Sequence, residues 1–104
     1  MSAPKAVGAE RALLGGLLMD PVQVSEVAAI LKPADFYVAS HGHVFAWLTE
    51  QARTNSHTDI ISLSDYMVGS DNIERMGGIA YATGLPEHCP STSNLSHYAQ
   101  RDSP

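Results

Sequence analysis

One segment constrains the fold more than any other: residues 8–20, which read GAERALLGGLLMD. Its apolar residues recur at helical spacing over a broad face. That face consists of Ala9, Ala12, Leu13, Leu14, Leu17 and Leu18. Gly15 and Gly16 interrupt the segment, although a glycine inside a helix costs about 1 kcal/mol relative to alanine. We therefore expect a buried helix that another helix approaches closely at these two glycines.

The start of this helix is predicted from the residues around it. Residues 1–7 are small or helix-breaking, so we expect a loose segment there and a helix that begins near Gly8. Glu10 then falls in the first helical turn, where a carboxylate complements the helix dipole. A phosphate-binding loop at the glycines would need a following Gly-Lys-Ser/Thr, which this sequence lacks.

A second helix is predicted over residues 22–31. Asp20 is suited to be its N-cap, Pro21 fits the first helical position, and Pro33 stops the helix after Lys32. The turn that follows reads PADFY, and its two aromatic side chains are expected to fill the core.

Two more amphipathic segments predict helices that begin at Ser40 and after Asp59, which acts as an N-cap. The apolar positions of these helices are Val44, Phe45, Leu48 and Ala52 in the first and Ile60, Leu63, Tyr66 and Met67 in the second. A short helical turn is expected in residues 69–78, and Gly77-Gly78 favours a tight turn between helices over an anion site. No run alternates apolar and polar residues, so the fold class is all-α, a compact bundle of about six helices, several of them short.

The histidines and the single cysteine raise the question of a metal site. His88, Cys89 and His97 are possible zinc ligands, but structural zinc sites pair ligands two to four residues apart in two sets, and no second pair exists here. His41 and His43 differ by two positions and lie on different faces of a helix. We therefore predict no metal ligands, and we interpret both of these histidines as surface or capping residues.

The region after Cys89 is instead interpreted as a loop and a final helix. Ser91 or Thr92 is the predicted N-cap, and Leu95, Tyr98 and Ala99 form the inner stripe. In this interpretation His97 is a surface side chain and Cys89 a small apolar group.

Length and charge exclude several classes of function. The chain has 104 residues, enough for one compact domain, and a net charge of −5 with six scattered Lys and Arg residues. Strong binding of nucleic acid needs clustered basic residues, so we do not expect it. A single cysteine, no apolar run near 20 residues and no signal peptide predict a cytoplasmic protein without a membrane span.

No catalytic motif is present. The sequence contains no Gly-x-Ser-x-Gly, no nucleotide-binding loop, no Cys-x-x-Cys and no His-Glu-x-x-His, and its acids show no acid–base spacing. The residues alone therefore favour a binding or assembly module over an enzyme.

Six short segments, taken in order, resemble the N-terminal domain of DnaB-type bacterial replicative DNA helicases. They are Glu10 with LLGGLLMD, then DFY with H..VF, D...L, GGIAY and P..SNLSHYA. The residues that carry the resemblance, most of them structural in that family, are Glu10, Leu14, Gly15, Asp20, Phe36, Tyr37, His41, Phe45, Asp59, Leu63, Gly77, Gly78, Tyr81, Pro90, Asn94 and Tyr98. Gly42 and His43 depart from the family pattern, which commonly has a basic and then an apolar residue there.

The resemblance implies a non-catalytic domain in the collar of a hexameric helicase, with other helicase subunits, a DnaG-type primase and a helicase loader as partners. It divides the chain into a flexible segment (1–7), the helical domain (8–101) and a tail (102–104). The 104 residues do not include the family's helical hairpin or its RecA-like ATPase domain. No cofactor is expected in them, because ATP and Mg²⁺ belong to that ATPase domain. Without the hairpin we expect a monomer or weak dimer.

An alternative of a different kind is a free-standing regulator, possibly of phage origin, that uses the same fold to bind helicase, primase or loader and block assembly. The reading frame after Pro104 separates the two: a nucleotide-binding loop there would exclude the regulator, and a stop codon would favour it.

Overall fold

The chain folds as a bundle of helices joined by turns. The computed structural model describes residues 3–93 and 95–102, and within these residues it contains helices and no strand. The elements in chain order are α1 (Ala3–Met19), η1 (Pro21–Gln23), α2 (Val24–Ala28), η2 (Pro33–Asp35), α3 (Ala39–Arg53), α4 (Ile60–Gly69), α5 (Ile79–Thr83), η3 (Leu85–His88) and α6 (Leu95–Asp102), where η marks a 3₁₀ helix. The predicted all-α class, with six α-helices of which several are short, is confirmed.

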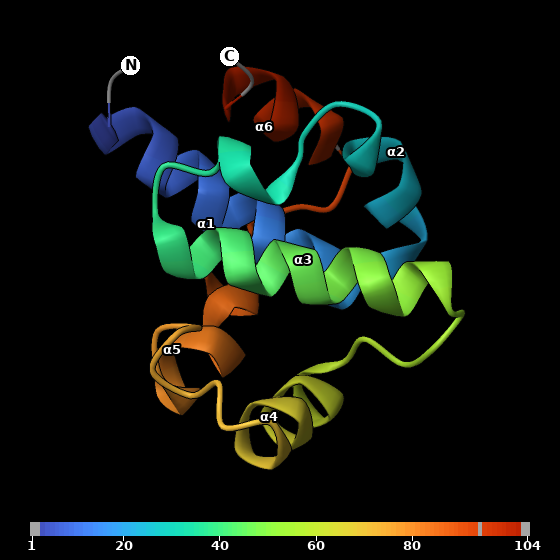
Figure 1. Cartoon of the computed structure of the whole chain (residues 1–104). Coiled ribbons are helices and arrows are strands. Elements are labelled where there is room, and N and C mark those ends of the chain that lie inside the picture. Colours follow the sequence, from blue (N-terminus) through green and yellow to red (C-terminus); the bar gives the residue numbers. More distant parts are fainter. Residues whose placement is uncertain (1–2, 94, 103–104) are drawn as a thin grey trace.

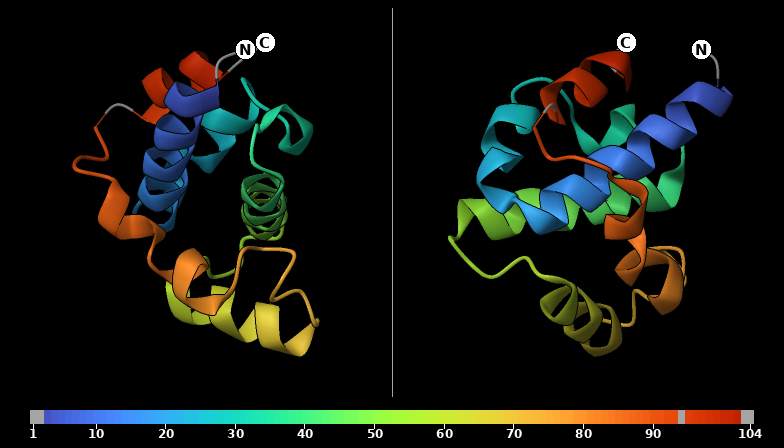
Figure 2. Two further views of the ribbon diagram at one scale, coloured as in Figure 1. Left: turned by 90° about the vertical axis from the view of Figure 1, so that its left-hand side faces the viewer. Right: turned by 180° about the vertical axis from the view of Figure 1, so that it is seen from behind.

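Helices α1 and α3 form the middle of the molecule (Figures 1 and 2). α2 and α6 lie on one side of this pair, and α4 and α5 lie at the opposite end. The most extensive packing is that of α1 against α6 and η3, with further contacts to α3. α4 packs chiefly against α5, so it is the most peripheral of the longer helices.

The broad apolar face predicted for α1 is buried as expected. Leu13, Leu14 and Leu17 have no exposed surface. They join one continuous core with side chains from every other α-helix, among them Val24, Val27, Val44, Phe45, Leu48, Leu63, Met67, Ala82, Leu95 and Ala99.

The two glycines of α1 mark close contacts, which confirms the prediction made for them. A methyl group at Gly15 would lie 2.1 Å from the carbonyl oxygen of Leu85, and one at Gly16 would lie 2.3 Å from a methyl carbon of Leu95. Gly16 therefore faces α6, whereas Gly15 faces the backbone of a 3₁₀ helix. Any larger side chain at these positions would force the two elements apart.

Helix α1 begins earlier than predicted. It starts at Ala3, so residues 3–7 are helical where we expected a loose segment. Pro4 is compatible with this start because the first helical turn needs no internal N–H donor. Glu10 consequently lies in the middle of α1 and not in its first turn, so the prediction that it complements the dipole of its own helix is wrong.

The second helical segment is shorter than predicted. Pro21 does occupy the first helical position, but in η1, and α2 ends at Ala28 and not at residue 31. The proline at position 33 holds Lys32 in an extended conformation, which stops the helical path before it. The side chain of Asp20 makes no cap bond to the backbone and accepts a 2.7 Å hydrogen bond from the Gln23 side chain.

The later boundaries agree more closely with the sequence. Asp59 caps α4 by accepting a 2.8 Å hydrogen bond from the Ser62 N–H, and this bond lowers the pKa of Asp59. Gly77 and Gly78 both have a φ of +94°, which suits glycine and confirms the tight turn. Residues 70–78 form turns without the predicted short helix. α6 begins at Leu95, later than an N-cap at Ser91 or Thr92 would place it.

We predict that Gly15→Ala destabilises the chain by about 2 kcal/mol or more, because its methyl group would overlap the Leu85 backbone. Gly8 provides a matched control in the same helix, since it is exposed and has no atom within 4 Å of its ideal Cβ. Gly8→Ala should leave the stability unchanged or raise it by up to about 1 kcal/mol. Urea unfolding of both variants would measure this difference, and equal stability of the two would contradict the close contact.

Candidate functional site

A buried cluster of polar side chains joins three helices. It contains Glu10 from α1, His41 from α3 and Tyr81 from α5, and the side chains of the first two are fully buried. A Glu10 carboxylate oxygen lies 2.7 Å from Nδ1 of His41. On the other side of the ring, Nε2 of His41 lies 2.6 Å from the Tyr81 hydroxyl. Residues far apart in the sequence are thus connected in one continuous chain of hydrogen bonds.

Backbone donors complete the environment of the Glu10 carboxylate. It accepts hydrogen bonds from the N–H groups of Tyr37 (2.5 Å) and Val38 (3.2 Å), which lie at the N-terminal end of α3. A carboxylate at this position complements the dipole of α3. Several donors on one carboxylate stabilise its ionised form, and an ionised Glu10 requires that Nδ1 of His41 carries the proton.

The geometry of this cluster indicates a structural function. A carboxylate, an imidazole and a phenol in sequence resemble a general-base arrangement, but Glu10 and His41 have no solvent-exposed surface. Both ring nitrogens of the imidazole have hydrogen-bond partners within the protein. The cluster therefore holds α1, α3 and α5 together.

The surface or capping position predicted for His41 is wrong, whereas His43 is exposed as predicted. The helical spacing did place the two histidines on different faces. The inner face accepts an imidazole because Glu10 provides a partner there, and that partner is 31 residues away in sequence.

The remaining residues of the family resemblance have mostly structural positions. Leu14, Phe36, Phe45 and Leu63 are buried in the core. Tyr37 is 59% exposed, so the expectation that both aromatics of the PADFY turn fill the core is correct only for Phe36. Tyr98 packs partly buried against the core, and Pro90 is exposed. Asn94 lies outside the described residues.

The candidate metal ligands do not converge. Among the described residues, no three side chains of His, Cys, Asp or Glu lie close enough to hold a metal ion. His88 and His97 are exposed, whereas Cys89 is buried and its Sγ lies 3.1 Å from the Ser91 carbonyl oxygen. Cys89 thus packs as a small apolar group with a weak hydrogen bond.

Exposed apolar side chains gather on α4. Ile61 and Val68 are 71% and 62% exposed, and Ile60 and Tyr66 are each 40% exposed. Ile61 and Val68 are seven residues apart and lie on the same side of the helix. We call Ile61 and Val68 the α4 surface. The helical spacing predicted Ile60 and Tyr66 to be in the core, but both are 40% exposed, and the exposure of Ile61 and Val68 was not predicted.

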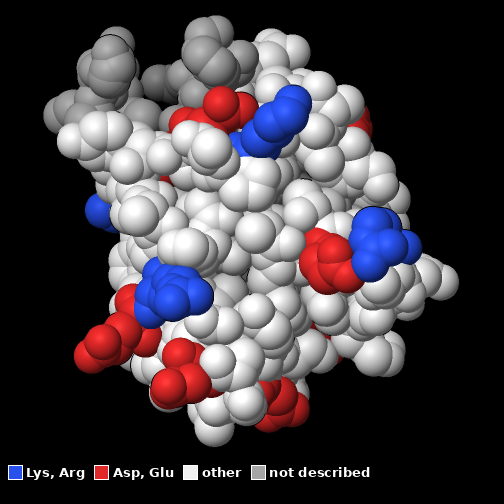
Figure 3. Space-filling view, viewed as in Figure 1, with Lys and Arg blue, Asp and Glu red and all other residues white. Residues whose placement is uncertain are grey.

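The charges on the surface are mixed. The face shown in Figure 3 has separate basic residues interspersed with acidic ones and no basic stripe. Among the described helices, none combines the length and apolar character that crossing a bilayer requires.

Comparison with known proteins points to one family. The DnaB-like helicase N-terminal domain family matches residues 2–101. The replicative DNA helicase DnaB of Geobacillus stearothermophilus is 30% identical over 97 residues, and that of Treponema pallidum is 32% identical over 97 residues. Each alignment covers 93% of this chain but only 21% or 22% of the relative. The chain thus spans about a fifth of the length of these helicases.

Solved structures agree with this assignment. The crystal structure of the N-terminal domain of DnaB helicase from Mycobacterium tuberculosis superposes with a TM-score of 0.85 and 25% identity, covering 92% of this chain and 70% of that one. A DnaB-like replicative helicase, solved to describe its interactions with primase, superposes with a TM-score of 0.77 and 24% identity over 92% of this chain and 22% of that one. The similarity to this DnaB-like helicase, at 24% identity, shows a shared fold and nothing more.

We predict that Tyr81→Phe lowers the free energy of unfolding by about 1–2 kcal/mol, because it leaves the buried Nε2 of His41 without its partner. Tyr37→Phe is the control, since it removes the same atom from an exposed side chain and should change the stability by less than about 0.5 kcal/mol. Thermal or urea unfolding would compare the two. A Tyr81→Phe variant as stable as Tyr37→Phe would show that the hydroxyl does not support the cluster.

Proposed function

Because this chain belongs to the DnaB-like helicase N-terminal domain family, we propose that it is a protein-interaction domain that acts in assembly of the helicase collar and in docking of a primase or loader during DNA replication. The part of the replicative helicases to which it corresponds is their non-catalytic N-terminal domain. ATP and Mg²⁺ would act in the C-terminal domain of the helicase.

The α4 surface is the observation that best supports an interaction domain. Large apolar side chains at 62–71% exposure are normally found where a partner covers them, particularly when they lie together on one element. α4 is also peripheral, so a partner can reach it without displacing another helix. The buried polar cluster, in contrast, is enclosed and has the character of a structural element.

A primase is the partner that the comparisons favour. The DnaB-like helicase of similar fold was described together with its interactions with primase. Helicase subunits are the second proposed class of partner, because assembly of a collar would require contacts between subunits. Direct binding of DNA is expected to be weak, because the net charge is −5 and phosphate binding depends on clustered basic residues.

We predict that the chain binds the DnaG-type primase of the same organism and that the double substitution Ile61→Ser with Val68→Ser weakens this binding at least tenfold. The reason is the loss of apolar area from the α4 surface, at about 25 cal/mol per Å². Both side chains are largely exposed, so the variant should fold like the unmodified chain. Isothermal titration calorimetry would measure the affinity and circular dichroism the fold.

Val22→Ser serves as the matched control. Val22 is the most exposed large apolar residue at 86%, and it lies in η1, outside the α4 surface. This variant should bind primase like the unmodified chain. If the double variant and Val22→Ser bind equally well, the α4 surface is not the docking surface. If the unmodified chain binds neither primase nor helicase subunits, the proposed function is wrong.

A further inference from the structure

A pocket opens between α3, α4 and the turn that follows α4. Its volume is about 220 Å³. The residues that line it are His43, Ala46, Trp47, Glu50, Gln51, Tyr66, Asn72, Arg75 and Met76. Small-molecule and cofactor sites usually measure about 300–1,000 Å³, so this pocket is better matched to one side chain of another protein.

The walls of the pocket are of mixed character, and their apolar part comes from Ala46, Trp47, Tyr66 and Met76. The rings of Trp47 and Tyr66 lie 6.1 Å apart at 36° to each other, and one comes from α3 and the other from α4. Met76 is buried beside them. Aromatic walls of this kind favour an apolar anchor residue.

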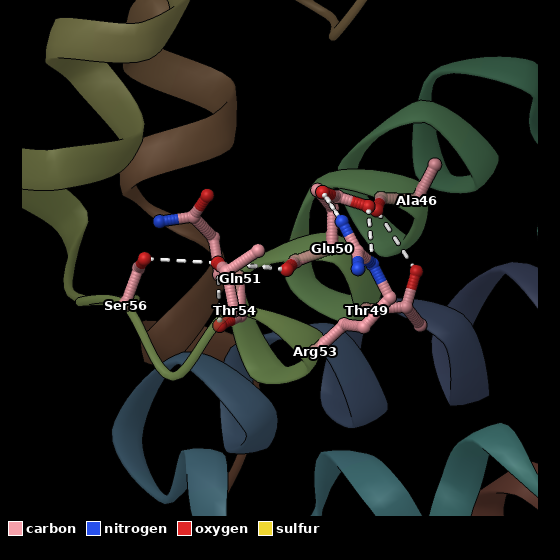
Figure 4. Close-up of polar contacts among 7 residues, drawn as sticks. All are labelled: Ala46, Thr49, Glu50, Gln51, Arg53, Thr54 and Ser56. Atoms are coloured by element: carbon pink, nitrogen blue, oxygen red, sulfur yellow. Dashed lines mark hydrogen bonds and ion pairs between the residues drawn. The ribbon is translucent and has the colours of Figure 1, made fainter.

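The only acidic residue that lines the pocket already has a partner. Arg53 holds Glu50 through two hydrogen bonds of 3.2 and 2.5 Å, and Figure 4 shows the guanidinium beside the carboxylate. The hydrogen bond from Arg53 lowers the pKa of Glu50, which keeps it ionised and paired. Arg53 therefore offsets the negative charge of Glu50 beside the pocket.

Arg75 lines the pocket and can donate hydrogen bonds to an anionic group of a ligand. Arg75 is exposed and forms no ion pair within the described part of the chain. An exposed guanidinium beside a partly apolar pocket is complementary to a carboxylate that neighbours an apolar side chain.

We propose that this pocket is a docking site for an acidic peptide segment of a partner protein, in which an apolar side chain enters the pocket beside the packed rings of Trp47 and Tyr66 and a neighbouring carboxylate binds Arg75. This inference deepens the proposed function and rests on it, because an interaction domain is what would dock such a segment. It adds the chemistry of the segment and the residues that receive it.

The probe for this site is the peptide acetyl-Ser-Glu-Leu-Asp-Ser-amide. Trp47 is the only tryptophan of the chain and the peptide contains none, so the intrinsic fluorescence reports on the pocket directly. Titration of the whole chain should give a saturable change with a Kd of about 0.01–1 mM, as expected for one anchor and one ion pair. Peptides with Ala in place of Leu, or with Gln and Asn in place of the two acids, should bind about tenfold more weakly.

Two substitutions test the assignment of residues. Arg75→Gln should weaken binding of the acidic peptide about tenfold or more, and Lys32→Gln, which removes the same charge from an exposed residue outside the pocket, should not. Ala46→Leu fills the pocket from a half-buried helical position and should abolish binding while the chain remains folded.

Three results would overturn the proposal: no saturable change, equal binding by Arg75→Gln and Lys32→Gln, or tighter binding of a peptide with lysines in place of the acids. These outcomes are independent of the primase titration. A chain that binds primase but not the peptide would retain the proposed function and lose this site.

Discussion

The arrangement of the helices depends on a carboxylate that is buried in the core. An ionised group without partners inside a protein would be strongly destabilising, so Glu10 is tolerated only where several donors meet. Those donors come from the start of α3 and from His41, and His41 in turn contacts Tyr81 of α5. Apolar packing alone would permit small sliding movements of α1 against α3, whereas these hydrogen bonds are satisfied in one register only.

Once this register is fixed, the contacts of the remaining helices follow. The glycine face of α1 meets η3 and α6 at distances that no side chain would permit. The hydrogen bond between Tyr81 and His41 joins α5 to α3, and α4 packs chiefly against α5. α4 thereby lies at one end of the molecule (Figure 1), and its Ile61 and Val68 side chains are exposed. A rigid center and an accessible peripheral helix are the combination that a docking domain needs.

Local patterns in the sequence predicted much of this fold. The apolar spacing of α1, the cap at Asp59 and the turn at Gly77-Gly78 depend on neighbouring residues, and all three were predicted correctly. The partner of His41 could not be predicted in this way, because Glu10 is distant in sequence and either residue alone is typical of a surface. The pocket beside Trp47 and the exposure of Ile61 depend on which helices fail to cover α4, and that is a property of the tertiary packing.

The coupling between Glu10 and His41 tests the account most directly. A double-mutant cycle with Glu10→Gln, His41→Gln and the double variant, measured by urea unfolding, isolates their interaction from the effects of each substitution alone. The account predicts a coupling free energy of about 1.5–3 kcal/mol, at the upper end for residues in contact. A coupling near zero would show that the two side chains contribute independently and that the buried pair does not fix the register of α1 and α3.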